Sequence, residues 1–284
     1  MLATTAPCHG GLAVMEILAM HFGKPFHVLQ IPSGSDEDAV ERLARRLEDS
    51  VEFISSVTGQ RPTPEKIAQA IEASNRARAL WKEVNELAAA VPTPQRPRDL
   101  INFGIVMNLF LGTEAAVEVA RTYRDEFAKR VERGEGGHPA ERVRLMWLQN
   151  RIQFRSGLDE ALAQMGAAVV LDELNHVFWD DIDPNRPYHG LARRMLSLPL
   201  CQSAQERART LVELAKLYRV QGAINPCHWG CRQGSGSRGI IQKFLREAGI
   251  PVINLEVDCV DERNFSEGQL RTRLEAFCEM LEGR

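Results

Sequence analysis

The second half of the sequence alternates short apolar segments with amphipathic segments of helical length, and this alternation constrains the fold most strongly. The apolar segments are predicted to be strands, and they lie at 142–148, 167–171, 222–225 and 251–256. The amphipathic segments are predicted to be helices, at 157–165, 203–218, 237–248 and 268–282. Strands that alternate with helices form a mostly parallel sheet covered on both faces. The sequence therefore predicts an α/β fold.

The first half of the sequence is mainly helical. A helical pattern follows Cys8, and a short strand is expected at 26–31. Further helices are expected at 36–58, 63–90, 98–110 and 113–133, before a linker at 134–139. We therefore expect two α/β lobes, one at 1–138 with a helical insertion at about 36–133, and one at 139–284. The strand before Cys8 is very short, so the first lobe is expected to be incomplete.

Charge and cysteine content exclude several classes of protein. The net charge is −3, whereas a nucleic-acid-binding domain usually carries a basic surplus. The apolar stretch at 101–111 contains two asparagines and falls short of the roughly 20 residues of a membrane span. The N-terminus lacks the pattern of a signal peptide. Six scattered cysteines do not resemble a secreted disulfide framework, so we expect a cytoplasmic protein with reduced thiols.

One segment between a predicted strand and a predicted helix is richer in chemical groups than the others. Residues 225–239 read NPCHWGCRQGSGSRG and contain two thiols, an imidazole, an indole, two arginines and four glycines. In open α/β sheets, ligands bind outside the carboxyl ends of the strands, near helix N-termini. This segment is therefore the main candidate for a functional site.

The glycines of this segment have the spacing of a dinucleotide-binding fingerprint. Gly234, Gly236 and Gly239 match it, and an acidic residue follows about 20 residues later, at Glu256 or Asp258. The first glycine of a fingerprint should form the turn directly after the strand, whereas about eight residues intervene here. This departure weakens the prediction of a nicotinamide or flavin site.

The thiols of the segment admit three further interpretations. Cys227, His228 and Cys231 can supply zinc ligands, but structural zinc sites usually use two spaced pairs, and no second pair lies nearby. The thiols can instead hold an iron–sulfur cluster together with cysteines from distant loops. A helix N-terminus after Cys231 would then stabilise the negative charge of the cluster. The segment can also be a glycine-rich connection with inert, buried cysteines.

A family resemblance rests on several marks in the C-terminal part of the chain. These marks are Cys231 at a strand end, Gly249-Ile250-Pro251, an acidic strand end at 256–258, and the stretch 268–277. With them, residues 227–281 closely resemble the 2-hydroxyglutaryl-CoA dehydratase component D family, which includes benzoyl-CoA reductase subunits. Residues 165–173 resemble the middle strand of the family. Thr4-Thr5 before Cys8 resembles another loop, in which His9 stands where the family usually has an acidic residue.

The resemblance implies two Rossmann-like or flavodoxin-like lobes with a [4Fe-4S] cluster at their junction. Three cysteines of a subunit usually bind this cluster, and two of them map to Cys8 and Cys231. The third would lie upstream of Met1, so we expect the chain to lack the first segment of the family. Cys227 is an alternative ligand. Without a third thiolate, the chain alone is expected to bind at most substoichiometric iron.

The resemblance also implies a reaction and partners. The reaction is the removal of water from an (R)-2-hydroxyacyl-CoA, in which an electron on the thioester carbonyl forms a ketyl radical and acidifies an otherwise inert β proton. The implied partners are a homologous subunit, an ATP-dependent activator iron–sulfur protein and the acyl-CoA substrate. Alternatives are a benzoyl-CoA-reductase-like or double-cubane-cluster reductase subunit, or a non-catalytic truncated member. Catalytic residues are not assigned.

Overall fold

The chain forms two compact units in the computed structural model. The structure describes residues 1–283, without the side chains at 97, 98, 100, 101, 102 and 105. The first unit comprises Met1–Arg76 and Phe178–Ser203, and the second comprises Ala77–Val177 and Ala204–Arg284. Both units contain a parallel sheet flanked by helices, so the predicted α/β class is confirmed.

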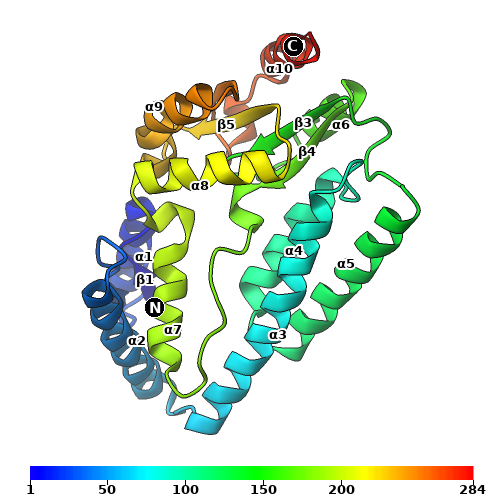
Figure 1. Cartoon of the computed structure of the whole chain (residues 1–284). Helices are drawn as coiled ribbons and strands as arrows, with labels where there is room; N and C mark the ends of the chain where they lie inside the picture. The colour runs from blue at the N-terminus through cyan, green and yellow to red at the C-terminus, as the bar shows by residue number, and fades with distance from the viewer. Residues whose placement is uncertain (284) are drawn as a thin grey trace. The chain divides into compact units, whose positions relative to one another are not determined.

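The first unit begins with a strand–helix–strand segment. Strand β1 (Leu2–Thr4) pairs in parallel with β2 (His27–Leu29), and α1 (His9–His21) connects them (Figure 1). The sheet of this unit has only these two strands within the described residues. The strand before Cys8 is thus present but short.

Helices α2 (Glu37–Thr58) and α7 (Pro187–Ser197) pack together in the first unit. Their contact contains Ala39, Val40, Leu43, Ala192 and Leu196. Asp36 caps α2 by accepting a hydrogen bond from the Ala39 N–H at 2.8 Å, and Gly59 ends the helix with a φ of 70°. The unit also includes the 3-10 helix η2 (Pro199–Cys201) and the start of α3 (Pro64–Ala88).

The second unit contains a four-stranded sheet in which all strands are parallel. The strands are β3 (Val143–Trp147), β4 (Ala167–Asp172), β5 (Gly222–His228) and β6 (Val252–Val257), in the order β4-β3-β5-β6 (Figure 1). After β4 the chain crosses to the other side of β3, so the strand order reverses between β3 and β5. Ligands of open α/β sheets bind at such a switch point, outside the carboxyl ends of the strands.

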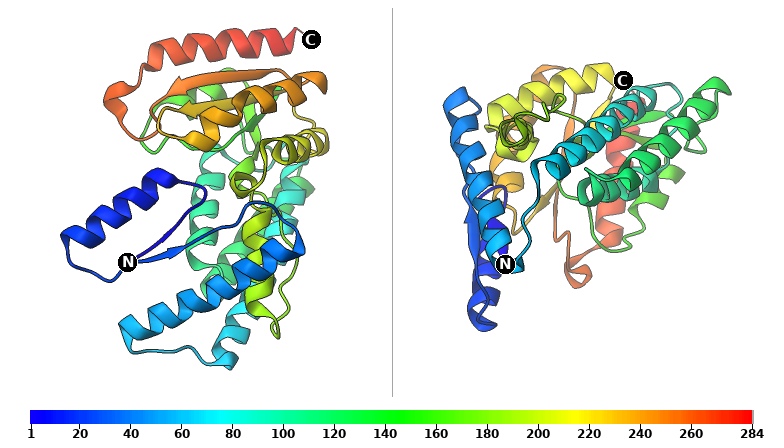
Figure 2. Two further views of the ribbon diagram at one scale, coloured as in Figure 1. Left: turned by 90° about the vertical axis from the view of Figure 1, so that its left-hand side faces the viewer. Right: turned by 90° about the horizontal axis from the view of Figure 1, so that it is seen from below.

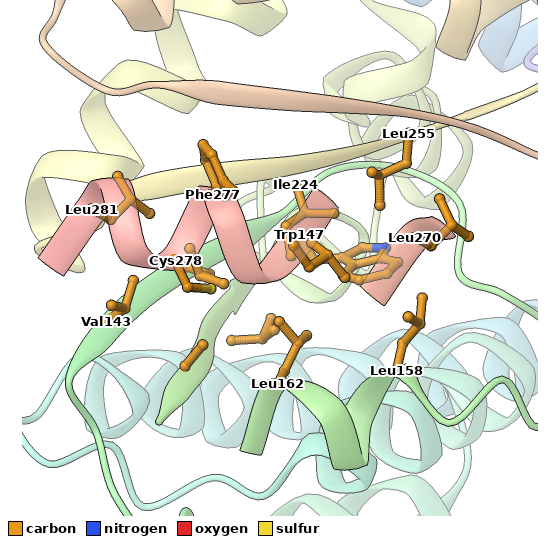
Figure 3. Packing of buried hydrophobic residues seen from close by; sticks show 14 of the residues in the cluster. Val143, Trp147, Leu158, Leu162, Ile224, Leu255, Leu270, Phe277, Cys278 and Leu281 are labelled. Carbon is orange, nitrogen blue, oxygen red and sulfur yellow. The ribbon is translucent and has the colours of Figure 1, made fainter. Parts of the chain in front are cut away.

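Helices cover both faces of this sheet. Helices α6 (Leu158–Gln164) and α10 (Glu267–Glu282) bury one face, where Trp147, Ile224 and Leu255 meet Leu162 and Phe277, among others (Figure 3). Helices α8 (Ala204–Leu217) and α9 (Arg232–Glu247) lie on the opposite face (Figure 2). The sheet is therefore a middle layer, and functional side chains can reach solvent mainly at its strand ends.

The second unit also holds most of the helical insertion. Helices α4 (Pro97–Phe110) and α5 (Glu114–Glu132) pack together, and the ring of Phe103 lies 5.4 Å from that of Trp81 in α3. Short 3-10 helices, η1 (Glu173–Asn175) and η3 (Glu262–Asn264), follow β4 and β6. None of the helices within the described residues is long and apolar enough to cross a membrane.

The division of the chain differs from the boundary expected at 138/139. That boundary lies inside the second unit, because α4 packs on β4. Residues 178–203 return to the first unit, because α7 packs on α2. The sequence pattern predicts no element between 173 and 203, where the structure has α7 and two 3-10 helices. Strand β5 also continues to His228, three residues beyond its expected end.

Candidate functional site

Cys8 and Cys231 occupy the same position relative to their helices. Cys8 is the N-cap of α1, and its Sγ accepts a hydrogen bond from the Gly11 N–H at 3.2 Å. Cys231 is the N-cap of α9, and its Sγ accepts from the Gly234 N–H at 3.3 Å. Both cysteines have extended backbone angles, and both follow the carboxyl end of a strand. The sequence Cys-x-x-Gly thus produces one local geometry twice.

In this geometry, an N–H from the first turn of a helix points at each sulfur atom. The first N–H groups of a helix lack intrahelical acceptors and lie at the positive end of the helix dipole. A thiolate, or a sulfur bound to a metal, is stabilised at such a position. Cys8 is exposed and Cys231 is half-buried, so neither sulfur is enclosed by its own unit. Cys8 belongs to the first unit, whereas Cys231 lies at the switch point of the second.

The other cysteines lie in different environments. Cys259 and Cys278 are buried, and burial raises the pKa of Cys259 to about 12 and that of Cys278 to about 11. Cys278 packs into the core of the second unit from α10 (Figure 3). Burial also raises the pKa of the half-buried Cys201. Burial thus disfavours the thiolate form of these three cysteines, and the thiolate is the form that binds metals.

Cys227, the alternative ligand, lies inside β5 rather than at a helix N-terminus. Its side chain is 2% exposed, and its thiol donates to the Asn225 carbonyl oxygen at 3.6 Å. The side-chain oxygen of Asn254 lies 3.7 Å from the same sulfur. Burial raises the pKa of Cys227, although the Arg238 guanidinium opposes this effect. Its surroundings therefore favour the protonated thiol.

Hydrogen bonds connect the loops after β3, β5 and β6. The Cys259 N–H donates to His228 Nδ1 at 3.0 Å, and the Gln153 N–H donates to the Cys259 carbonyl oxygen at 2.7 Å. Between His228 and Cys231, Trp229 is 60% exposed and does not pack into the core. The sequence stretch singled out above thus places an indole and a sulfur at the surface of the second unit.

A buried polar network lies behind the first turns of α9. Glu173 is 0% exposed and forms two bonds with Arg207, Nε to Oε1 at 2.5 Å and Nη2 to Oε2 at 2.6 Å. Arg207 Nη1 lies 3.2 Å from Ser237 Oγ in α9. The Gln149 N–H donates to Glu173 Oε2 at 2.9 Å. Sequence analysis missed this network; its only signal was the acidic pair that follows the apolar strand β4.

Asp172, the other carboxylate of this acidic pair, is the last residue of β4. Asp172 pairs with Arg151, whose guanidinium lies 5.5 Å from the centre of the Trp147 ring. Burial raises the pKa of Asp172, although the Arg151 cation beside it acts in the opposite direction. Trp147, Arg151 and residues 152–160 line a pocket of about 410 Å³ after β3. Gln153 lines this pocket, and its backbone N–H donates to the Cys259 carbonyl oxygen, so the pocket is adjacent to the loop after β6.

The structure disagrees with two alternative interpretations of the cysteine segment. Gly234, Gly236 and Gly239 lie inside α9, so none of them forms the turn after β5 that a dinucleotide fingerprint requires. Within residues 1–283, no three His, Cys, Asp or Glu side chains lie close enough together to hold a metal ion. Cys227, His228 and Cys231 therefore do not form the zinc site that their spacing allowed. The two N-cap sulfurs have donor chemistry suited to iron, one sulfur in each unit.

Comparison with known proteins decides the family. The sequence model of the family "2-hydroxyglutaryl-CoA dehydratase, D-component" matches residues 1–281. The chain belongs to this family. The resemblance inferred from the sequence is therefore confirmed, and it extends over both units.

Individual members of the dehydratase family are distant in sequence. The chain is 22% identical to the (R)-phenyllactyl-CoA dehydratase alpha subunit of Clostridium sporogenes, over 96% of this chain and 68% of the relative. It is 24% identical to a benzoyl-CoA reductase subunit of Thauera aromatica, over 99% and 70%. It is 22% identical to the (R)-2-hydroxyglutaryl-CoA dehydratase alpha subunit of Acidaminococcus fermentans, over 94% and 57%. The chain thus spans between 57% and 70% of the length of these relatives.

Proposed function

We propose that this chain is an iron–sulfur subunit of a cytoplasmic (R)-2-hydroxyacyl-CoA dehydratase, with Cys8 and Cys231 as ligands of a [4Fe-4S] cluster. The observation that carries this proposal is the matching N-cap geometry of the two cysteines. Two of the three cysteines that the resemblance implies map to Cys8 and Cys231, and each of these sulfurs accepts an N–H from the first turn of a helix. Cys227 is retained only as the alternative ligand, since its thiol is buried in β5.

The residues around the sulfurs would control their electronic properties. Each N–H that donates to a ligand sulfur stabilises the more reduced, more negative state of a cluster, so the Gly11 and Gly234 N–H groups would tune its potential. When bound, such a cluster would supply single electrons of low potential to the thioester carbonyl, and each electron would return once hydroxide and the β proton have left, so that only water is removed. The two helix N-termini hold the ligand sulfurs in place.

A partner subunit is part of the proposal. The relatives are named as subunits, and helix α1 carries large apolar side chains that the chain leaves uncovered, such as Ile17 at 64% and Met20 at 77% exposure. Exposed apolar patches commonly mark protein–protein contacts. We infer a homologous subunit as the partner, together with an ATP-dependent activator protein that delivers electrons.

A second candidate function is a reductase of the benzoyl-CoA type. The observation in its favour is the 24% identity to the benzoyl-CoA reductase subunit over 99% of this chain. Both reactions would use the same two cysteines, so the ligands do not separate them. The product separates them, because a dehydratase releases water and forms an enoyl-CoA, whereas the reductase adds electrons to an aromatic acyl-CoA.

Anaerobic reconstitution with iron and sulfide tests the ligand assignment. We expect Cys231→Ala to abolish iron binding and the visible absorption of the cluster. Cys278→Ala is the matched control, because Cys278 is a packed core thiol, and iron binding should persist in this variant. Iron that persists in Cys231→Ala at the wild-type level would overturn the proposal.

A turnover assay tests the reaction. The reconstituted chain, with its partner and an activator supplied with ATP and reductant, should convert an (R)-2-hydroxyacyl-CoA to the enoyl-CoA. Consumption of an aromatic acyl-CoA without loss of water from the hydroxyacyl-CoA would favour the reductase instead.

A further inference from the structure

Gln149 has an unusual conformation at the switch point of the sheet. It follows β3 closely, its side chain is 1% exposed, and its φ is 47°. A left-handed backbone is uncommon for a residue with a side chain, and such residues cluster at functional sites when the surrounding structure holds them in place. Gln149 is held by contacts with the end of β4, with β5 and with α9.

The two amide groups of Gln149 are engaged by neighbouring strands. Its backbone N–H donates to Glu173 Oε2 at 2.9 Å, after β4. Its side-chain Nε2 donates to the Pro226 carbonyl oxygen at 3.1 Å and also to the side-chain oxygen of Asn225, both in β5. The side-chain Oε1 is buried and has no hydrogen-bond partner among the residues that the structure describes. Orphaned buried acceptors are rare, so the position of this oxygen requires an explanation.

This oxygen faces the first turn of α9. A Cβ atom added to Gly234 would lie 2.1 Å from Gln149 Oε1 and 2.7 Å from its Cδ. A Cβ added to Gly236 or Gly239 of the same helix would meet nothing within 4 Å. Only Gly234 therefore requires the absence of a side chain. Its N–H is also the group that donates to Cys231 Sγ at 3.3 Å.

The next turn of α9 is held by the same network. Ser237 lies 3.2 Å from Arg207 Nη1, and Arg207 pairs with Glu173, which in turn accepts from Gln149. The start of α9 therefore rests on side chains that are fixed to the carboxyl ends of β3, β4 and β5.

We propose that Gln149 is a positioning residue for Cys231. Its buried amide fixes the backbone of Gly234, and this backbone fixes the N–H that donates to the Cys231 sulfur. As far as a cluster is concerned, the inference rests on the proposed function. The placement of the sulfur itself does not depend on a cluster, so it can be tested in iron-free protein.

The test measures how fast Cys231 is alkylated by iodoacetamide in the reduced, iron-free, full-length chain, with each cysteine resolved by mass spectrometry. Gly234→Ala pushes the first turn away from Gln149 and moves the Gly234 N–H away from the Cys231 sulfur. Alkylation of Cys231 should slow about two- to threefold, because one lost hydrogen bond lowers the reactive fraction about fivefold while a higher intrinsic nucleophilicity offsets part of this loss. Cys8 is the internal reference and should react at its wild-type rate. Gly236→Ala, the matched control, should leave both rates unchanged.

A second substitution tests whether Gln149 is the cause. Gln149→Gly removes the amide that the new methyl group would strike, so the double variant with Gly234→Ala should recover at least half of the lost rate. If Gly234→Ala does not accumulate as folded protein, Gln149→Leu keeps the bulk but removes the bond to Pro226, and it should slow Cys231 in the same way.

Several results would overturn the inference. These are a Cys231 rate that stays unchanged or rises in Gly234→Ala, the same change in Gly236→Ala, or no recovery in the double variant. Iron reconstitution separates this inference from the proposed function. If the wild-type chain binds no iron, the cluster assignment fails, while the alkylation rates still decide the role of Gln149. If iron binds, Gly234→Ala should also shift the electron paramagnetic resonance spectrum of the cluster, whereas Gly236→Ala should not.

Discussion

Replacement of Arg207 by methionine should strongly destabilise the second unit. Arg207 is 3% exposed and its partner Glu173 is 0% exposed, so the ion pair is shielded from water. Without Arg207, the Glu173 carboxylate loses two hydrogen bonds and keeps the one from the Gln149 N–H. Breaking a buried ion pair by removing one partner costs about 3–5 kcal/mol, because an uncompensated charge stays buried. We expect the free energy of unfolding to fall by this amount.

Urea unfolding followed by tryptophan fluorescence measures this change. Arg271→Met is the matched control, since Arg271 pairs with Glu275 on the surface, with side chains 46% and 42% exposed. An exposed pair contributes between about 0 and 1 kcal/mol, so this control should be nearly neutral. The double variant Arg207→Met/Glu173→Leu removes both charges and should recover most of the loss. Equal stabilities of Arg207→Met and Arg271→Met would refute the reasoning.

Three further changes probe the packing and the buried titratable groups. Burial lowers the pKa of His176 to about 4. Between pH 6.5 and 4, His176 is therefore protonated in the unfolded state but neutral in the folded state. Stability is therefore lost as the pH falls through this window, and His176→Gln should reduce the loss between pH 7 and pH 5 by about 2 kcal/mol in urea titrations. Cys278→Ala leaves a small cavity and should lower stability by about 1–2 kcal/mol in the same assay. Gly222→Ala places a methyl group 2.6 Å from Leu281 Cδ1 and should cost about 1–3 kcal/mol, whereas Gly239→Ala, with open space around it, should cost nothing measurable.

Local patterns were sufficient to predict most of the elements of the second unit. The strands at 143–147 and 167–172 are entirely buried and apolar except for Arg144 and Asp172, so their signal does not depend on distant partners. Strand β5 is longer than its pattern, because Pro226 and Cys227 continue the pairing with β6. A proline normally marks the end of a predicted strand, because it has no N–H to donate to the neighbouring strand.

The division into units depends on contacts that no local pattern contains. Helix α7 joins the first unit through Glu37 of α2, which accepts hydrogen bonds from His189, at 2.6 Å, and from Arg193. These residues are about 150 positions apart, so their pairing could not be read from spacing. The hydrogen bonds, from His189 first, also lower the pKa of the exposed Glu37 carboxyl.

The candidate site was predicted in part. Cys8 and Cys231 were selected by resemblance, and the Cys-x-x-Gly sequence that both share could have indicated the N-cap geometry. The role of Gln149 could not be predicted, because nothing in the sequence marks a glutamine for a left-handed backbone. The Arg207–Glu173 pair brings together α8 and the end of β4, and only the folded chain shows it.

The central claim is that Cys8 and Cys231 bind the same cluster, and cysteine protection by iron tests it most directly. The chain is reconstituted anaerobically to several iron contents and alkylated, and each cysteine is quantified by mass spectrometry. The account predicts that the protected fractions of Cys8 and Cys231 rise together and match the fraction of chains that carry iron, while Cys201 reacts as in the iron-free chain. Protection of one of the two without the other, or iron binding with both still reactive, would contradict it.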